Sequence, residues 1–478
     1  MSVPRSLFRA AAPMLSRAEA EAVAKKALSF ATAEETRVSI RSVTRANTRF
    51  AVNQISTAGD TTDTSVTVRS AYGKKSATAM GNRMDDASLK ALVASAEALA
   101  QLSPDDPEAM PELGPQQFEE SKGWSEPTAQ LDPMARAAAV KQITQPARAA
   151  GLVSTGFVES TGSAVGIANN KGLFAYARSS SAVLTTTVRT PDGQGSGWGG
   201  GSHWDWGKID ATAIGATAIQ KAKASRSPVA VEPGRYTVVL EPTAVGNLVQ
   251  LIRGALNARA ADEGRSFFTK PGGGTKIGQK VMDERVTIVS DPLDPDLYDE
   301  TFSGEGLPQR RVVWIENGVL KNLAYDRYWA AQKGIEANTG GGGGGRGGGG
   351  GGGGGGANGS GGGFKMSGGE QSLDELIAGT NRGILVTRFW YIRPVDQRTI
   401  LYTGLTRDGT FLIEGGKITK AVKNLRFNES PIFMLNNLEA MGRPVRVSAS
   451  ESGNAGQAVV APAIRTRDFS FTSLSDAI

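Results

Sequence analysis

The chain of 478 residues contains no cysteine and only one histidine, His203. Without cysteine there are no disulfides, no thiolate nucleophile and no cysteine-ligated metal. A Ser-His-Asp triad or a zinc site would have to use His203, because both depend on an imidazole nitrogen. Asp205 lies two residues further on and could orient this ring. The alternative is a loop histidine that packs locally beside Trp204 and Trp206.

Long hydrophobic runs are also missing. No stretch of 18 or more apolar residues occurs, so no transmembrane helix is expected. Residues 1–12 carry Arg5 and Arg9 and lack the apolar core of a secretory signal. Together with the absence of cysteine, these features predict a cytoplasmic protein without a membrane partner.

The chain is basic, with a net charge of +6 and a pI near 9.3. Such a balance raises the question of nucleic-acid binding. The 53 lysines and arginines are spread along the whole chain, however, and form no dense basic run. We therefore expect no nucleic-acid partner.

The order of the expected elements predicts an α+β fold, in which a mixed helix–sheet domain precedes a strand-rich one. Residues 1–105 form an N-terminal α/β part, and residues 106–233 add a helix and a β-meander to the same domain. Residues 234–478 form the strand-rich C-terminal domain. A capping box at Ser16 and Glu19 opens the first helix, and prolines at 104, 107, 111 and 115 mark a linker.

Alternation and helical spacing locate the individual elements. Helices are expected at residues 16–30, 85–102, 131–150, 209–224, 373–377 and 432–441. Strands are expected at 37–40, 48–55, 63–71, 157–160, 164–169, 174–179, 182–190, 236–240, 286–289, 311–315, 318–323, 384–391, 399–405, 411–414, 417–422 and 459–471. Residues 192–205 are rich in glycine and are expected to form a loop.

Residues 340–363 are of low complexity, since 20 of these 24 residues are glycine. A segment of this composition gains nothing from burial and is expected to be a flexible loop.

The most informative segment runs from Val238 to Ala255. Val245, Leu248, Val249, Ile252 and Leu256 follow helical spacing, which predicts an amphipathic helix over residues 243–261. The segment resembles the one that carries the zinc motif His-Glu-x-x-x-His in the TldD/PmbA family, also called TldD/TldE. Aligned on Val-Val-Leu and Gly246, the motif falls on Gln250, Leu251 and Ala255.

Further blocks in the same order resemble that family and together span most of the chain. They are residues 48–55, 264–268, 299–311, 314–321, 325–327 and 413–418. In the catalytic members a third zinc ligand, a cysteine, lies near the C-terminus, and the matching position here holds Ser452.

The resemblance implies a TldD/PmbA-like fold and a chain whose zinc site has been lost. Imidazole and thiolate bind zinc and a carboxylate activates its water, whereas Gln250, Leu251 and Ala255 offer none of these groups. The family pairs such a chain with a zinc-bearing TldD-like subunit. We therefore expect a non-catalytic subunit without a cofactor, zinc in the partner of a heterodimer, and unfolded or leader peptides as substrates.

Two alternatives remain open. One is a hydrolase that uses acid/base chemistry at Glu300 and Glu305, or at His203 with Asp205. The other is a self-associating scaffold that captures peptides or proteins without cleaving them.

Surface residues around the acidic block are candidates for contacts with substrate or partner. They are Glu305, Arg310 and Arg311, to which His203 is added; each could equally be a solvated surface charge or a local packing residue. An acidic cluster of Asp294, Asp296, Asp299, Glu300 and Glu305 supplies the oxygen ligands that calcium takes, although its spacing is not that of an EF-hand.

Overall fold

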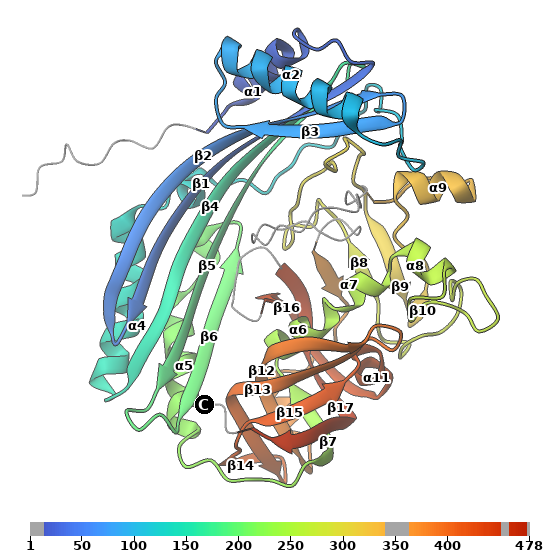
Figure 1. Cartoon of the computed structure of the whole chain (residues 1–478). Helices are drawn as coiled ribbons and strands as arrows, with labels where there is room; N and C mark the ends of the chain where they lie inside the picture. Colours follow the sequence, from blue (N-terminus) through green and yellow to red (C-terminus); the bar gives the residue numbers. More distant parts are fainter. Residues whose placement is uncertain (1–13, 340–362, 451–457, 476–478) are drawn as a thin grey trace, which may run out of the picture.

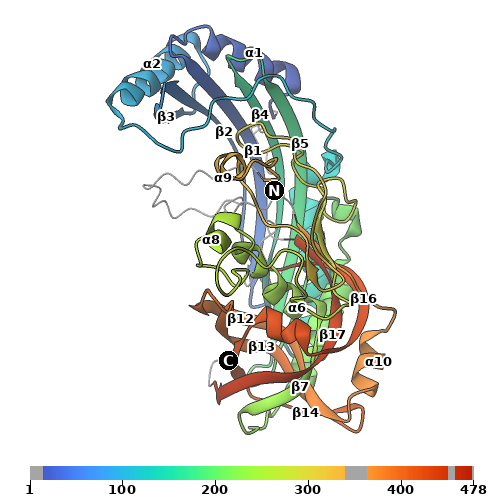
Figure 2. The same cartoon turned by 90° about the vertical axis from the view of Figure 1, so that its right-hand side faces the viewer.

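The computed structural model describes residues 14–339, 363–450 and 458–475. Two β-sheets dominate it, and a long curved sheet from the N-terminal half arches over a second sheet from the C-terminal half (Figure 1). Figure 2 shows α1, α2 and β3 at one end of the molecule and β7 and β14 at the other. The predicted α+β class is confirmed.

The first sheet is antiparallel and six-stranded, in the order β3-β2-β1-β4-β5-β6. Its strands are β1 (Glu35–Ala51), β2 (Gln54–Tyr72), β3 (Lys75–Gly81), β4 (Val153–Asn169), β5 (Phe174–Arg189) and β6 (Ser196–His203). The predicted breaks at 41–47, 161–163 and 180–181 are wrong, because β1, β4 and β5 each run on without interruption, whereas the predicted break at 170–173 is confirmed. The strand predicted over 48–55 is divided between the end of β1 and the start of β2. The turn between β1 and β2 lies at Val52 and Asn53, both with positive φ.

Helices cover one face of this sheet. They are α1 (Arg17–Leu28), α2 (Asp86–Leu102), α3 (Glu126–Ala129), α4 (Pro133–Ala149) and α5 (Ala211–Ala224). Alternate residues of the strands point at them, so that Val38 packs with Leu89 and Val93, and Phe50 packs with Ile143. The opposite alternate residues face the second sheet.

The glycine-rich segment expected as a loop contains strand β6, which corrects that prediction. A Cβ atom added to Gly197 would lie 2.3 Å from the carbonyl oxygen of Ala218 in α5. The glycines therefore allow a helix to lie directly on the strand.

The second sheet combines the remaining strands. They are β7 (Gly234–Leu240), β8 (Ile288–Ser290), β9 (Val312–Glu316), β10 (Val319–Leu320), β11 (Phe364–Met366), β12 (Arg382–Asp396), β13 (Leu401–Glu414), β14 (Lys417–Ala421), β15 (Leu425–Glu429), β16 (Leu438–Ser448) and β17 (Ala458–Leu474). Because β7 pairs with both β12 and β17, the strands β7, β12, β13, β15 and β17 close into a ring. Phe389, Phe427 and Phe469 stack in its core.

The segment predicted as one helix over residues 243–261 is divided into three. These are α6 (Pro242–Val249), α7 (Ile252–Ala255) and α8 (Ala258–Asp262). The side chain of Asn257 accepts a hydrogen bond from the N–H of Ala260 and so begins a new helix. The apolar face is kept throughout, because Val245, Leu248 and Ile252 all enter the core.

The remaining helices are short: η2 (Trp206–Lys208), α9 (Arg327–Lys333), α10 (Leu373–Ala378) and α11 (Pro431–Asn436). The helix predicted over 432–441 ends at Asn436, and β16 follows at once. None of the described helices is long and apolar enough to span a bilayer. Ser452 and residues 340–362 of the glycine tract lie outside the described residues.

Candidate functional site

A cleft of about 1720 Å³ separates the first sheet from the helices that follow β7. Arg37, Arg69 and Thr78 of the sheet line one wall, and residues of α7, α8 and α9 line the other. Leu251 and Ala255, two of the three positions aligned with the zinc motif, also line this cleft. The structure therefore places the altered motif at this cleft, although the sheet that completes the cleft comes from the other half of the chain.

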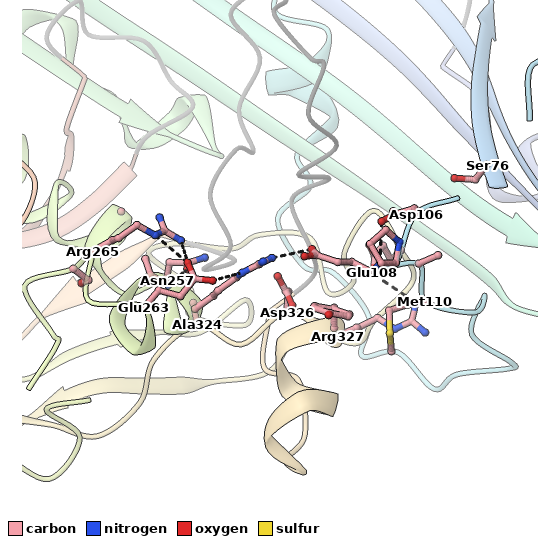
Figure 3. A pocket seen from close by; sticks show the side chains of 18 of the residues that line it. Ser76, Asp106, Glu108, Met110, Asn257, Glu263, Arg265, Ala324, Asp326 and Arg327 are labelled. Carbon is pink, nitrogen blue, oxygen red and sulfur yellow. Dashed lines mark hydrogen bonds and ion pairs between the residues drawn. The ribbon is translucent and has the colours of Figure 1, made fainter. Parts of the chain in front are cut away.

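A chain of ion pairs runs along the cleft (Figure 3). Arg259 donates to Glu108 at 2.8 Å and to Glu263 at 2.9 Å, and Glu263 also binds Arg265. The bond from Arg259 is the main reason that the pKa of Glu263 is lowered. On the sheet wall Arg37 and Arg69 both bind the buried carboxylate of Glu112. Each of these arginines has a carboxylate partner, and the pairs join the linker of residues 103–112 to both walls.

The amide of Gln250 takes part in a hydrogen-bonded junction. Its Nε2 donates to the carbonyl oxygen of Ala449 at 2.6 Å, and Nδ2 of Asn247 donates to the same oxygen at 2.8 Å. The Oδ1 of Asn247 accepts from the N–H of Phe389. Two side-chain amides thus fix α6 to the end of β16, three residues before Ser452.

These residues do not fit a zinc ion. Zinc takes imidazole, thiolate or carboxylate ligands, whereas Gln250 uses its amide nitrogen as a donor to Ala449. Leu251 packs against the apolar core, and Ala255 carries no polar side-chain atom. Within residues 14–339, 363–450 and 458–475, no three His, Cys, Asp or Glu side chains are grouped closely enough to hold a metal.

The acidic block does not form one site. Asp294 and Asp296 accept from Lys365 at 2.8 and 3.1 Å. Asp299 and Glu300 are half-buried. Burial raises the pKa of both, and that of Glu300 reaches about 7 with the negative charge of Asp299 beside it. A site shared by all five acids is therefore not formed, and Glu300 stands out as a carboxyl group that titrates near neutral pH.

Arginines from three segments surround this carboxyl pair. The charges of Arg253 and Arg446 act on Asp299, and that of Arg41 acts on Glu300. Arg253 follows Gln250 by three residues and lies 4.4 Å from the ring centroid of Phe364. Burial lowers the pKa of Arg446 to about 10, which leaves it cationic at neutral pH.

His203 does not form a catalytic pair with Asp205. Its Nδ1 accepts the backbone N–H of Asp205 at 2.9 Å, and the carboxylate of Asp205 accepts from Gly207 instead. Burial, and then the charge of Arg446, lower the pKa of His203. The residue lies where β6 meets the second half of the chain, since Arg446 donates to the carbonyl oxygen of Ser202 at 2.8 Å.

The other residues predicted to contact substrate or partner do not lie together in the structure. Glu305 lines the cleft and lies 3.6 Å from Arg327. Arg310 and Arg311 are exposed beyond it and do not line the cleft. Of the paired carboxylates proposed for acid/base chemistry, Glu300 therefore lies beside Asp299, whereas Glu305 faces a basic residue.

Several residues of this region were missed from the sequence. Asn247 and Arg253 lie three residues before and after Gln250, and this helical spacing alone indicated a shared face. No local pattern indicated Arg41, Glu108 or Arg446, because each lies far along the chain from the residues that it contacts.

Comparison with known families agrees with the architecture. Residues 233–473 match the profile of the PmbA/TldA metallopeptidase C-terminal domain. Residues 122–226 match the central domain of the same family, and residues 37–100 match its domain 1.

Individual relatives match over parts or all of the chain. A metalloprotease of Methanothermobacter thermautotrophicus is 25% identical over 251 residues, which cover 51% of this chain and 50% of that protein. A metalloprotease TldD homolog of Haemophilus influenzae is 28% identical over 250 residues, covering 51% and 49%. The matched stretch thus spans about half the length of these curated relatives.

The crystal structure of TldE from Thermococcus kodakarensis superposes with a TM-score of 0.80 at 17% identity. The superposition covers 95% of this chain and 99% of that one. At this identity the likeness concerns the fold alone.

Proposed function

The chain belongs to the PmbA/TldA metallopeptidase family, and on that premise we propose that it is a metal-free, non-catalytic subunit of a TldD/TldE-type zinc protease. The observation that carries the proposal is the chemistry of Gln250, Leu251 and Ala255. The amide of the first is committed to Ala449, and the other two have no donor atoms. Ser452 supplies a hydroxyl where the catalytic members have a thiolate.

The proposed subunit acts by completing an enclosed chamber for a zinc-bearing, TldD-like chain. The preserved cleft supports this role, because the scaffold around the altered motif is intact while its ligands are not. Unfolded or leader peptides are the proposed substrates of the assembly, which we place in the cytoplasm. A second copy of the chain is the alternative partner.

The direct test is metal content. The purified chain is incubated with excess zinc, desalted and analysed by mass spectrometry, with a zinc-bearing TldD-type chain as the positive control. We expect less than about a tenth of an equivalent, because a stable site needs three or four good ligands. A full equivalent that survives desalting would show that the ligand assignment is wrong.

The second test is activity. The isolated chain should leave a labelled, unfolded protein uncleaved, and a mixture with a TldD-type chain should cleave it faster than that chain alone. A mixture with unchanged rate, and no complex on gel filtration, would contradict the subunit role.

One observation favours a second candidate, a hydrolase that uses acid/base chemistry. A carboxyl group with a pKa of about 7, as Glu300 has, can both donate and accept a proton at neutral pH. Activity of the isolated chain that survives a chelator and is lost in Glu300→Gln would support this candidate over the first.

A further inference from the structure

Strand β2 presents an open edge along half of its length. Strand β3 pairs with it from Val66 to Tyr72 only. From Gln54 to Ser65, the described part of the chain provides no strand on the outer side of β2, and residues 54–61 are all exposed. Figure 1 shows β2 at the outer edge of the sheet, with β3 covering only its upper end. A row of backbone N–H and C=O groups is therefore available for pairing.

This edge has little of the usual protection. Open edges are commonly blocked by proline, charged side chains or bulges. Residues 54–65 contain neither proline nor lysine, and their charged residues are Asp60, which pairs with Arg136, and Asp63. One register shift, at Arg49 and Phe50 of the partner strand, lies next to the turn. Residues 57–65 then run in regular register with β1, so nine consecutive positions can accept a further strand.

Three arginines lie behind the edge, on the face of the sheet that points away from the helices. Arg41, Arg45 and Arg49 of β1 are exposed and are spaced four residues apart, so they share one face. No acid lies within ion-pair distance of them in the described residues, although the charge of Arg41 also acts on Glu300 from a longer distance. Arg37 and Arg69, further up the same face, by contrast share an ion pair with Glu112.

The pairing of β1 with β2 places a β2 residue opposite each of the three arginines, again at a spacing of four residues. Arg49, Arg45 and Arg41 lie opposite Thr57, Thr61 and Ser65 of β2. The rows between them place Gly59 opposite Asn47 and Asp63 opposite Val43. Each arginine is thus separated from the edge by one small hydroxyl side chain, and Asp63, the acidic residue of β2 on this face, lies in a row without an arginine.

Glu159 of β4 also lies on this face, opposite Asn47. It lies in the row of Gly59, on the side of β1 away from the edge. A strand added to β2 would lie about 10 Å from β1, at two strand spacings. An arginine and a glutamate side chain that extend toward each other across a threonine can span that distance.

We propose that the β2 edge binds an extended peptide with acidic side chains at every fourth position, which pairs with residues 57–65 as an added strand. The backbone supplies affinity, and Arg41, Arg45 and Arg49 select the acidic residues. The proposal rests on the proposed function and names the class of peptide that this subunit would hold. β3 ends where the open edge begins, so the added strand would continue the row of β3, whose Ser76 and Thr78 line the cleft.

The experiment measures binding of a fluorescein-labelled, twelve-residue peptide to the full chain by anisotropy. The probe carries glutamate at every fourth position among threonine, serine and glutamine. Its counterparts carry lysine at those positions, or the same glutamates in one block. We expect the periodic acidic peptide to bind most tightly and to weaken as salt is added. Equal binding of the periodic and blocked peptides would overturn the proposal.

Arginine variants test the charged row. Arg45→Gln should weaken binding of the periodic probe by about twofold to fivefold, as expected for an exposed ion pair. Arg226→Gln removes the same charge from an exposed site outside the edge and should leave the affinity unchanged. Equal effects of the two substitutions would show that only the net charge matters, which contradicts selection by this row.

N-methylated probes test the backbone pairing. In a paired strand alternate N–H groups point toward the neighbour, so methylation of one alternate set should abolish binding and methylation of the other set should be tolerated. If both sets bind equally, the peptide does not add to the sheet and the proposal fails.

A second copy of the chain is the competing occupant. Because the chain has no native cysteine, Ala58→Cys places a single thiol on the exposed edge. Rapid disulfide-linked dimer formation that the peptide does not inhibit would assign the edge to a second copy and refute the peptide proposal. Failure of peptide binding leaves the metal-content test untouched, so the two proposals can fail separately.

Discussion

Replacing Glu300 by glutamine should remove a pH dependence from the stability of the protein. Burial raises the pKa of Glu300 from 4.5 to about 7 in the folded chain. Between these values the unfolded chain releases the proton while the folded chain keeps it, so the folded state loses stability as pH rises through this window. At 1.36 kcal/mol for each pH unit, the loss is at most about 3 kcal/mol. The neutral amide of Glu300→Gln does not titrate and avoids that loss.

Urea unfolding of the wild type and the variant, followed by tryptophan fluorescence from about pH 4.5 to about pH 8, measures the difference. The free energy of unfolding of the wild type should fall more steeply than that of Glu300→Gln. Glu263→Gln is the matched control, because the pKa of this exposed carboxylate is shifted in the opposite direction, downward, by Arg259. Removing the Glu263 charge should therefore lower the stability slightly at neutral pH. Identical pH slopes for the wild type and Glu300→Gln would refute the raised pKa of Glu300.

The remaining predictions concern packing and hydrogen bonds. Asn247→Leu should destabilise the protein by about 1–3 kcal/mol, because it leaves the buried N–H of Phe389 without its acceptor; an unchanged urea midpoint would contradict the junction at Ala449. Gly197→Ala should cost about 1–3 kcal/mol, since the new methyl group overlaps the backbone of α5, and a melting temperature like that of the wild type would refute this contact. Gly254→Ala, where a Cβ meets no atom within 4 Å, should be neutral or stabilising by up to about 1 kcal/mol, as alanine favours a helix.

The fold could be predicted where local pattern and tertiary environment agree. The helices α1, α2 and α5 and the strand β17 lie close to their predicted positions, because their apolar periodicity coincides with the buried face. Strand β6 could not be predicted, since its glycines reflect the approach of α5 and not a turn. The sequence predicts a helix over residues 438–441, because the apolar residues around them fit both the helical and the strand period. In the structure these residues pair with β17 and form a strand.

The candidate site, like the fold, could be predicted from the sequence only in part. The alignment of the motif onto Leu251 and Ala255 led to two residues of the cleft, since their spacing along one segment is visible in the sequence. The partners of that segment were not predictable, because Ala449 lies 199 residues beyond Gln250 and the charges around Asp299 come from three separate segments. A contact of that kind depends on the global topology, which local propensity does not encode.

The pairing of β17 has a consequence for the order in which the two halves of the protein form. All six strands of the first sheet, with α1, α4 and α5, are complete once residue 224 has been synthesised. The second sheet cannot form until β17 has been synthesised, because β17 pairs with β7, β11, β15 and β16. Of these strands β17 is the last to leave the ribosome. During that interval the apolar strands from β7 onward have no completed ring to enter, and they are exposed to aggregation. A nascent chain should therefore need chaperone protection mainly while its second half is being made.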